Sequence, residues 1–478
     1  MAKHIILLSL FAFTIPPLFA QADFSNRVLT LKTTRYDLDV RVDYEDRKLF
    51  SACRLTVSNP TEEAVDHVPL LLYRLLRITS VRDPGRNALS FTQQVLSFED
   101  WEALQINYVE IYPETPIAPG EEQTLVLEYE GFLFGYTETG MRYVQDRIDP
   151  EFTIIRPDSW GYPVVGYPSW KINRAAGLPA FAYRLHVTVP DSFVVANGGK
   201  LINRKRDDEH VTYTYENIKP AWRIDIAIAD YRVREAGSNR VFYFPEDEEG
   251  AARVMDALQT TLDLYTEWFG PLQEYQGYTV VEIPDGWGSQ ADVTSIIQTA
   301  AAFKEAERTL EVYHEISHLW NVEEKEALPP RWNEGLASFL QYLTVEKVEG
   351  RAVLDDALEH TTARLREAVQ NRPHYQHIPL IDFGQEEVTG LSYRLGMVLF
   401  AVFYELVGEA QFNAIIGSFY QTYYASGATT DDFVNHAKHV SPVDLTRFFE
   451  DWIYGTESWT HIQNRASVDQ IVQEYRAK

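Results

Sequence analysis

The chain has 478 residues and a mass of 55.0 kDa, which is more than one hydrophobic core usually organises, so we expect two domains. Hydrophobic residues make up 45% and charged residues 24%, a balance that excludes a disordered or fibrous chain. The net charge of -27 repels phosphate backbones and anionic lipid head groups, which excludes nucleic acid as a partner.

Residues 1–22 are typical of an export signal. A positive start at Lys3 precedes an apolar stretch, and Ala20-Gln21-Ala22 fits a small-x-small cleavage site. The apolar stretch contains Pro16 and Pro17 and is shorter than the ~20 residues that span a bilayer. No later stretch is expected to span one. We therefore expect a periplasmic or secreted protein without stable membrane insertion, and the oligomeric state stays open.

Apolar residues alternate with a period of two from Tyr36 to about residue 235, the pattern of half-buried strands. Turn signals such as Asp83-Pro84-Gly85 and Asn197-Gly198-Gly199 separate these strands. A β-sandwich or saddle of many short strands is the natural architecture. The single cysteine, Cys53, excludes an internal disulfide.

The period becomes helical after Asp247 and stays mainly helical to the C-terminus, with one further strand at 278–283. We therefore expect four segments in the chain. They are a signal peptide (1–22), an N-terminal β-domain (23–238), an α+β catalytic domain (239–460) and a C-terminal tail (461–478).

The segment His314-Glu315-Ile316-Ser317-His318 carries the chemistry. It lies in a run without glycine or proline, and residues four apart on a helix share one face, so both imidazoles can reach one metal ion. Glu315 projects beside them toward the water that attacks the substrate. A catalytic zinc uses three protein ligands and one open position, and Glu334, at the start of the next predicted helix, is the expected third ligand.

These residues resemble the gluzincin zinc metallopeptidases of the aminopeptidase-N family, in peptidase clan MA. The similarity extends over about residues 30–456. It implies a thermolysin-like catalytic domain, one Zn2+ ion and peptide substrates. It also places Tyr393 at the position of the family's catalytic tyrosine, the donor of a hydrogen bond to the oxyanion. The motifs that carry the resemblance are 261–270, 314–318, 331–339, 392–396, 427–432 and 448–452.

The chain departs from the family in three places. Fifteen residues separate His318 from Glu334, fewer than is usual, so the loop between the helices is shorter. The family's large helical C-terminal domain is expected to be absent. The Gly-x-Met-Glu-Asn signature, whose glutamate holds the substrate amine, is replaced by the candidate substrate-binding residues Gly288, Ser289, Gln290, Ala291 and Asp292. Ala291 cannot bind a cation, and Asp292 offers a carboxylate only at a shifted position.

The sequence favours zinc-dependent hydrolysis of peptide bonds, aminopeptidase-like in type, with Glu315 as the general base. Two alternatives stay open. One is a catalytically retired peptidase fold that serves as an extracellular binding module, and the other is hydrolysis of a small non-peptide such as an epoxide. The remaining histidine pairs, His374 with His377 and His436 with His439, are interpreted as surface or packing residues.

Overall fold

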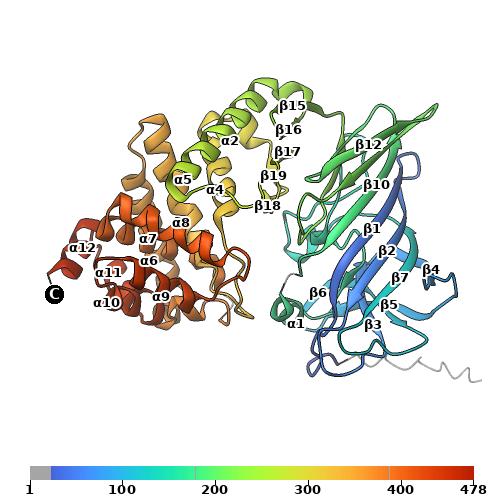
Figure 1. Cartoon of the computed structure of the whole chain (residues 1–478), viewed down its shortest axis with the longest axis horizontal. Coiled ribbons are helices and arrows are strands. Elements are labelled where there is room, and N and C mark those ends of the chain that lie inside the picture. Colours follow the sequence, from blue (N-terminus) through green and yellow to red (C-terminus); the bar gives the residue numbers. More distant parts are fainter. Residues whose placement is uncertain (1–22, 178, 387, 478) are drawn as a thin grey trace, which may run out of the picture.

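The computed structural model describes residues 23–177, 179–386 and 388–477. The expected export signal, residues 1–22, lies outside these described residues. Within them, strands dominate the N-terminal half and helices the C-terminal half, and the two halves lie side by side (Figure 1). The predicted order of a β-domain followed by a mainly helical domain is therefore confirmed.

A long seven-stranded sheet forms one layer of the N-terminal half. Strand β1 shows why the sequence forms it, because Leu38, Val40 and Val42 are buried while the residues between them face outward. β1 pairs in parallel with β10, so Val40 lies opposite Val187. In spatial order the strands are β12 (Lys200–Arg206), β13 (His210–Glu216), β10 (Ala182–Pro190), β1 (Lys32–Asp43), β2 (Lys48–Ser58), β7 (Glu122–Gly131) and β4 (Leu76–Arg82).

A four-stranded sheet shares one hydrophobic core with the seven-stranded sheet, which gives the predicted sandwich of two layers. Its strand β3 is buried along its whole length. A small three-stranded sheet lies next to them. The strands of the four-stranded sheet are β5 (Ser90–Phe98), β6 (Trp101–Tyr112), β3 (Val68–Tyr73) and β9 (Val164–Val165), and those of the small sheet are β11 (Val194–Ala196), β14 (Ile226–Ala229) and β8 (Thr153–Ile155).

A mixed five-stranded sheet begins the C-terminal half. Its hairpin β15–β16 spans the boundary expected at residue 238, and its last strand, β18, lies at the free edge, antiparallel to β19. The long helix α2 (Glu248–Phe269) connects β16 to β17. In spatial order the strands are β15 (Arg232–Ala236), β16 (Asn239–Tyr243), β17 (Thr279–Ile283), β19 (Ser295–Thr299) and β18 (Gln290–Asp292).

A small hydrophobic cluster connects the two halves. It combines Phe152 and Ile154 from the N-terminal half with Val281 and Trp287 from the five-stranded sheet and the turn that follows β17. The ring centroids of Phe152 and Trp287 are 5.0 Å apart. The halves therefore share buried apolar surface at the edge of the five-stranded sheet.

Helices form the rest of the C-terminal half around a second large core. Helix α5 crosses α7 where Gly335 meets Gly396, and a Cβ atom on Gly335 would lie only 2.4 Å from the Cα of Gly396. This close crossing places the first turns of α5 and α7 side by side. The helices are α1 (Trp170–Ala176), α3 (Ala301–Lys304), α4 (Leu310–Ser317), α5 (Trp332–Thr344), α6 (Leu354–Asn371), α7 (Ser392–Val407), α8 (Glu409–Tyr423), α9 (Thr430–Val440), α10 (Thr446–Phe449), α11 (Glu457–Gln463) and α12 (Val468–Arg476).

The segment Thr389–Val407, which includes α7, is long and apolar enough to cross a membrane by length and composition alone, with a mean hydropathy of 1.4. By length and composition, this segment departs from the expectation that no stretch after the first 22 residues could span a bilayer. Of its most apolar window, 67% is buried inside the protein, as expected for the central helix of a core. Residues 461–478, the predicted C-terminal tail, contain α12, whose Ile471 and Val472 are buried.

Candidate functional site

Both histidines of the motif project from one face of α4 and the turn that follows it. Val312, Tyr313 and Ile316 bury the opposite face in the helical core, which fixes the rotation of the helix. His314 lies in α4, and His318 begins a short 3₁₀ turn, His318–Trp320. The two side chains are largely buried, with 13% and 17% of their surface exposed.

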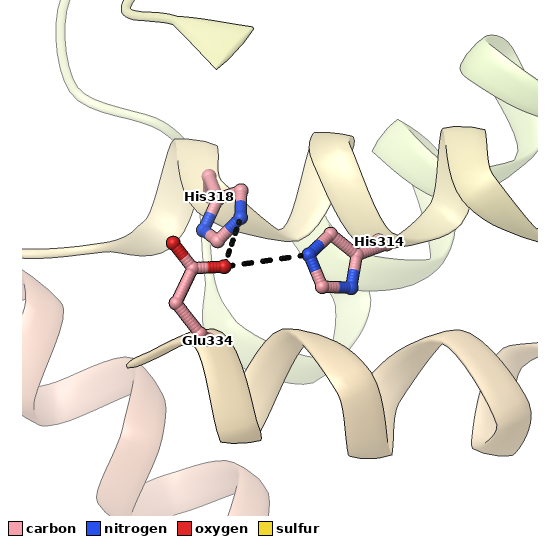
Figure 2. Close-up of side chains that lie close together, drawn as sticks. All are labelled: His314, His318 and Glu334. Atoms are coloured by element: carbon pink, nitrogen blue, oxygen red, sulfur yellow. Dashed lines mark ion pairs between the residues drawn. The ribbon is translucent and has the colours of Figure 1, made fainter. Parts of the chain in front are cut away.

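Glu334 meets both imidazoles from the first turn of α5. One oxygen, Oε2, lies 3.5 Å from Nε2 of His314 and 3.5 Å from Nε2 of His318 (Figure 2). The candidate ligand atoms of the three residues all lie within 4.8 Å of one another. The three side chains therefore converge as the sequence predicts. His314 comes from α4, His318 from the 3₁₀ turn that follows it, and Glu334 from α5.

The second oxygen of Glu334, Oε1, accepts a hydrogen bond from the guanidinium group of Arg331. Arg331 caps α5 in the left-handed region, with a φ of 57°, and this backbone turn directs its side chain back over the first turn. Burial alone would raise the pKa of Glu334. Contacts with His318, His314 and Arg331 outweigh burial and hold this pKa well below its ordinary value.

Glu315 follows His314 on α4, and its environment disfavours the charged form. Burial raises the pKa of this carboxyl to about 7, and the negative charges of Glu334 and Glu311 act in the same direction. A carboxyl group tuned close to neutrality can both take up and release a proton, which is what a general base that later acts as an acid requires.

Tyr393 lies in the first turn of α7, beside the imidazole of His314. Its ring is stacked on that of His314, with 6.2 Å between centroids and an interplanar angle of 5°. The guanidinium carbon of Arg331 lies 6.0 Å from the same ring. Burial, and then the charge of Glu334, raises the pKa of the phenol, so Tyr393 keeps its proton and can donate a hydrogen bond.

The segment Gly288–Asp292 forms the approach to β18 and the strand itself, which packs against α4. Ser289 Oγ accepts hydrogen bonds from the backbone N–H of Thr299 at 3.1 Å and from Nε2 of Gln298 at 3.0 Å. Nε2 of Gln298 is also 3.0 Å from Oε2 of Glu311 on α4. These contacts connect the edge strand to the helix that carries both histidines.

Asp292 does not face an open cleft. It is only 9% exposed, and burial raises its pKa to about 7. Ala291 is partly exposed and has no polar side-chain atom. Of these two residues, only Asp292 has a carboxylate, and that side chain is largely buried.

Two residues next to the histidine–glutamate cluster were not predicted from the sequence. One is Arg331, described above. The other is Asn321, whose side-chain amide lies 2.7 Å from Nδ1 of His318. The other histidine pairs stay apart from the cluster: His436 is 2.7 Å from Ser418 Oγ, and His374 is exposed. Only proximity to a recognised metal ligand could have drawn attention to Asn321 or Arg331.

The fold and the arrangement of the three candidate ligands are those of zinc metallopeptidases. Residues 291–452 match the model of the peptidase family M1 domain, and this stretch contains both histidines, Glu334 and Tyr393. A search of the curated proteins finds no match to the chain.

Solved structures with the same fold include M1 zinc metallopeptidases from Deinococcus radiodurans. A mutant of that enzyme bound to a Tyr-Ser-Ala substrate is 18% identical, with a TM-score of 0.63, and the match covers 89% of this chain and 94% of that one. The enzyme without a mutation is also 18% identical, with a TM-score of 0.61, and covers 91% and 93%.

Proposed function

We propose that this protein hydrolyses peptide bonds with one zinc ion held by His314, His318 and Glu334. The observation that carries the proposal is the convergence of the three candidate ligand atoms within 4.8 Å. Two imidazole nitrogens and one carboxylate oxygen are the donor set of many catalytic zinc sites, and they leave a further coordination position free. The residues present therefore fit the ion.

When bound, zinc supplies a positive charge that acidifies water and polarises the peptide carbonyl. The chain supplies the proton chemistry. Glu315 takes the proton from the attacking water and delivers it to the amine that leaves. Tyr393 donates a hydrogen bond to the oxygen that becomes negative. Loss of one such donor typically lowers the rate ~10²–10³-fold.

The test combines zinc analysis with mapping of the cuts in a mixed peptide library. We expect cleavage that a chelator abolishes and zinc restores. Glu315→Gln should keep near-stoichiometric zinc and lose ~10²–10⁴-fold in turnover, whereas His318→Ala should lose the metal as well. Glu307→Gln, an exposed position just before α4, is the matched control and should behave as the wild type.

Equal turnover by Glu315→Gln and wild type would remove the assigned base. A wild type that binds zinc but cleaves nothing would favour a binding module instead. Cleavage of an epoxide with no cleavage of peptides would favour the small-molecule hydrolase.

The specificity we propose is not strictly that of an aminopeptidase. Ala291 offers no charge to a free amine and Asp292 is buried, so the N-terminus of the substrate gains little from this strand. Peptides with acetylated N-termini should be cleaved within a few-fold of the free forms. A loss of cleavage on acetylation, measured on matched peptide pairs, would show that another acidic residue holds the amine.

We also propose that the protein is exported, to the periplasm or outside the cell. The proposal rests on the sequence of residues 1–22 alone. Mass spectrometry of the N-terminus after expression tests it: a mature chain that begins after Ala22 supports export, and an intact N-terminus in the cytoplasm contradicts it.

A further inference from the structure

The N-terminal half contacts the turn that leads into β18 at three points. Gln145 Nε2 donates a hydrogen bond to the carbonyl oxygen of Gly286 at 2.9 Å. The guanidinium group of Arg156 donates to the carbonyl oxygen of Trp287 at 3.3 Å. The third contact reaches the strand itself, because Nε2 of Gln290 donates to Oδ1 of Asp158 at 2.7 Å. Together these contacts hold consecutive parts of residues 286–290 against the other half of the molecule.

The groups that make these contacts are themselves immobilised. Arg156 is fully buried and forms a two-pronged ion pair with Asp146, which is also fully buried. Asp158 accepts a second hydrogen bond, from Arg223 at 2.8 Å, and Arg223 pairs with Asp225 at 2.6 Å. Each of these buried charges depends on its ion-pair partner, because a buried charge without a partner is costly. The paired side chains are therefore held in place.

The turn needs this support because its own backbone is adaptable. Gly286 and Gly288 have φ values of 84° and 73°, in the left-handed region that glycine adopts without strain. A Cβ on Gly288 would lie 3.2 Å from the Cβ of Tyr143, so the turn also approaches the N-terminal half closely. β18 has only three residues and one neighbouring strand, β19, so its position depends on what holds the turn.

Resting on the proposed function, we infer that Asp158 and Gln290 are positioning residues, through which the N-terminal half fixes the edge strand that pairs with an extended substrate. A free edge strand offers backbone N–H and C=O groups to a peptide, and these groups select peptides that extend along it. The substrate class is therefore an extended peptide that reaches several residues from the scissile bond. A minimal substrate that contacts the metal centre alone gains nothing from the arrangement.

The test uses a peptide that the wild type cleaves and a truncated form that keeps the same scissile bond. Gln290→Met removes the hydrogen bond to Asp158 with little change in volume. We expect kcat/KM for the long peptide to fall about 10-fold through KM, that for the short peptide to change less than about 2-fold, and the zinc content to stay constant. Gln290→Glu places a second carboxylate next to Asp158, and the resulting repulsion should lower kcat/KM for the long peptide further.

Hydrogen–deuterium exchange supplies a readout that does not depend on turnover. Protection of residues 286–292 should decrease in Gln290→Met, while the helical core keeps its protection. Gln94→Met, the same substitution at an exposed position of β5, is the control and should change neither measurement.

Unchanged protection in Gln290→Met, or an equal loss of kcat/KM for both peptides, would overturn the inference and leave the network a purely stabilising one. Failure of the wild type to cleave any peptide would instead contradict the proposed function, so the two failures are distinguishable.

Discussion

Glu334 uses its two carboxylate oxygens for different contacts. Oε2 faces both imidazoles and Oε1 is bound to Arg331, so the carboxylate is held with one oxygen available to a metal. His318 is held in a similar way from the other side, by Asn321. Partners of this kind set the orientation of a ligand before the metal arrives, which reduces the cost of ordering it.

Asn321 should therefore matter for zinc affinity. A metal at Nε2 of His318 requires the proton on Nδ1, and the amide oxygen of Asn321 can accept that proton once the amide is rotated. Asn321→Ala removes the acceptor, and we expect zinc affinity to fall ~10–100-fold in competition with a chelator. Asn464→Ala, at an exposed position, is the control. An unchanged affinity in Asn321→Ala would show that the orientation of His318 does not depend on this amide.

At the scale of elements, the site depends on the crossing of α5 and α7. Glu334 and Tyr393 stand in the first turns of the two helices, close to the contact between Gly335 and Gly396. Because neither glycine carries a side chain, the backbones approach closely, and this approach brings the phenol beside the candidate metal ligands. Gly335 thus serves packing, although it lies next to a candidate ligand in the sequence.

Gly335→Ala should disturb both stability and the site. Its Cβ would meet backbone atoms of Gly396 at 2.4 Å, which cannot move aside as a flexible side chain can. We expect a loss of ~1–3 kcal/mol in the free energy of unfolding, seen as a lower Tm, together with reduced turnover because Tyr393 is displaced. In Gly390→Ala, where nothing lies within 4 Å of the added Cβ, neither quantity should change. Wild-type stability in Gly335→Ala would mean that the helices separate at little cost.

At the scale of the whole molecule, one buried carboxyl should make stability depend on pH. Glu282 in β17 is fully buried; its Oε2 accepts from the backbone N–H of Phe244 at 2.7 Å, and no partner of Oε1 is found among the described residues. Burial, and then the neighbouring Asp247, raises its pKa to about 9. The folded protein therefore keeps a proton that the unfolded chain loses near pH 4.5.

Because the folded state binds the extra proton, the free energy of unfolding decreases as the pH rises. The stabilisation is complete below about pH 4.5 and is lost as the pH rises toward 9, with a slope of at most about 1.4 kcal/mol per pH unit. Denaturant unfolding between pH 5 and 8 should show this slope in the wild type and a flatter dependence in Glu282→Gln. Glu122→Gln, at an exposed position, should keep the wild-type slope. A slope that Glu282→Gln leaves unaltered would assign the pH dependence to other groups.

Much of the fold could be predicted from the sequence because its signals are local. The alternation in β1, the helical period of α2 and the spacing of His314 and His318 each depend on neighbours a few residues away. Pairing between distant segments has no such signal. The parallel pairing of β1 with β10 and the hairpin β15–β16 across the expected domain boundary emerged only in three dimensions. The same holds for Arg331 and Asn321, whose roles arise from loop geometry.

Helix α12 packs against α7, the helix that carries Tyr393. Ile471 and Val472 are buried, Arg476 donates to the carbonyl oxygen of Glu405 on α7 at 2.7 Å, and Tyr475 donates to Asp451 at 2.9 Å. Anyone who shortens the gene to a minimal catalytic fragment ending near residue 460 would expose the apolar back of α7. Such a fragment would tend to precipitate, so a shortened version for crystallisation or engineering should retain these last residues.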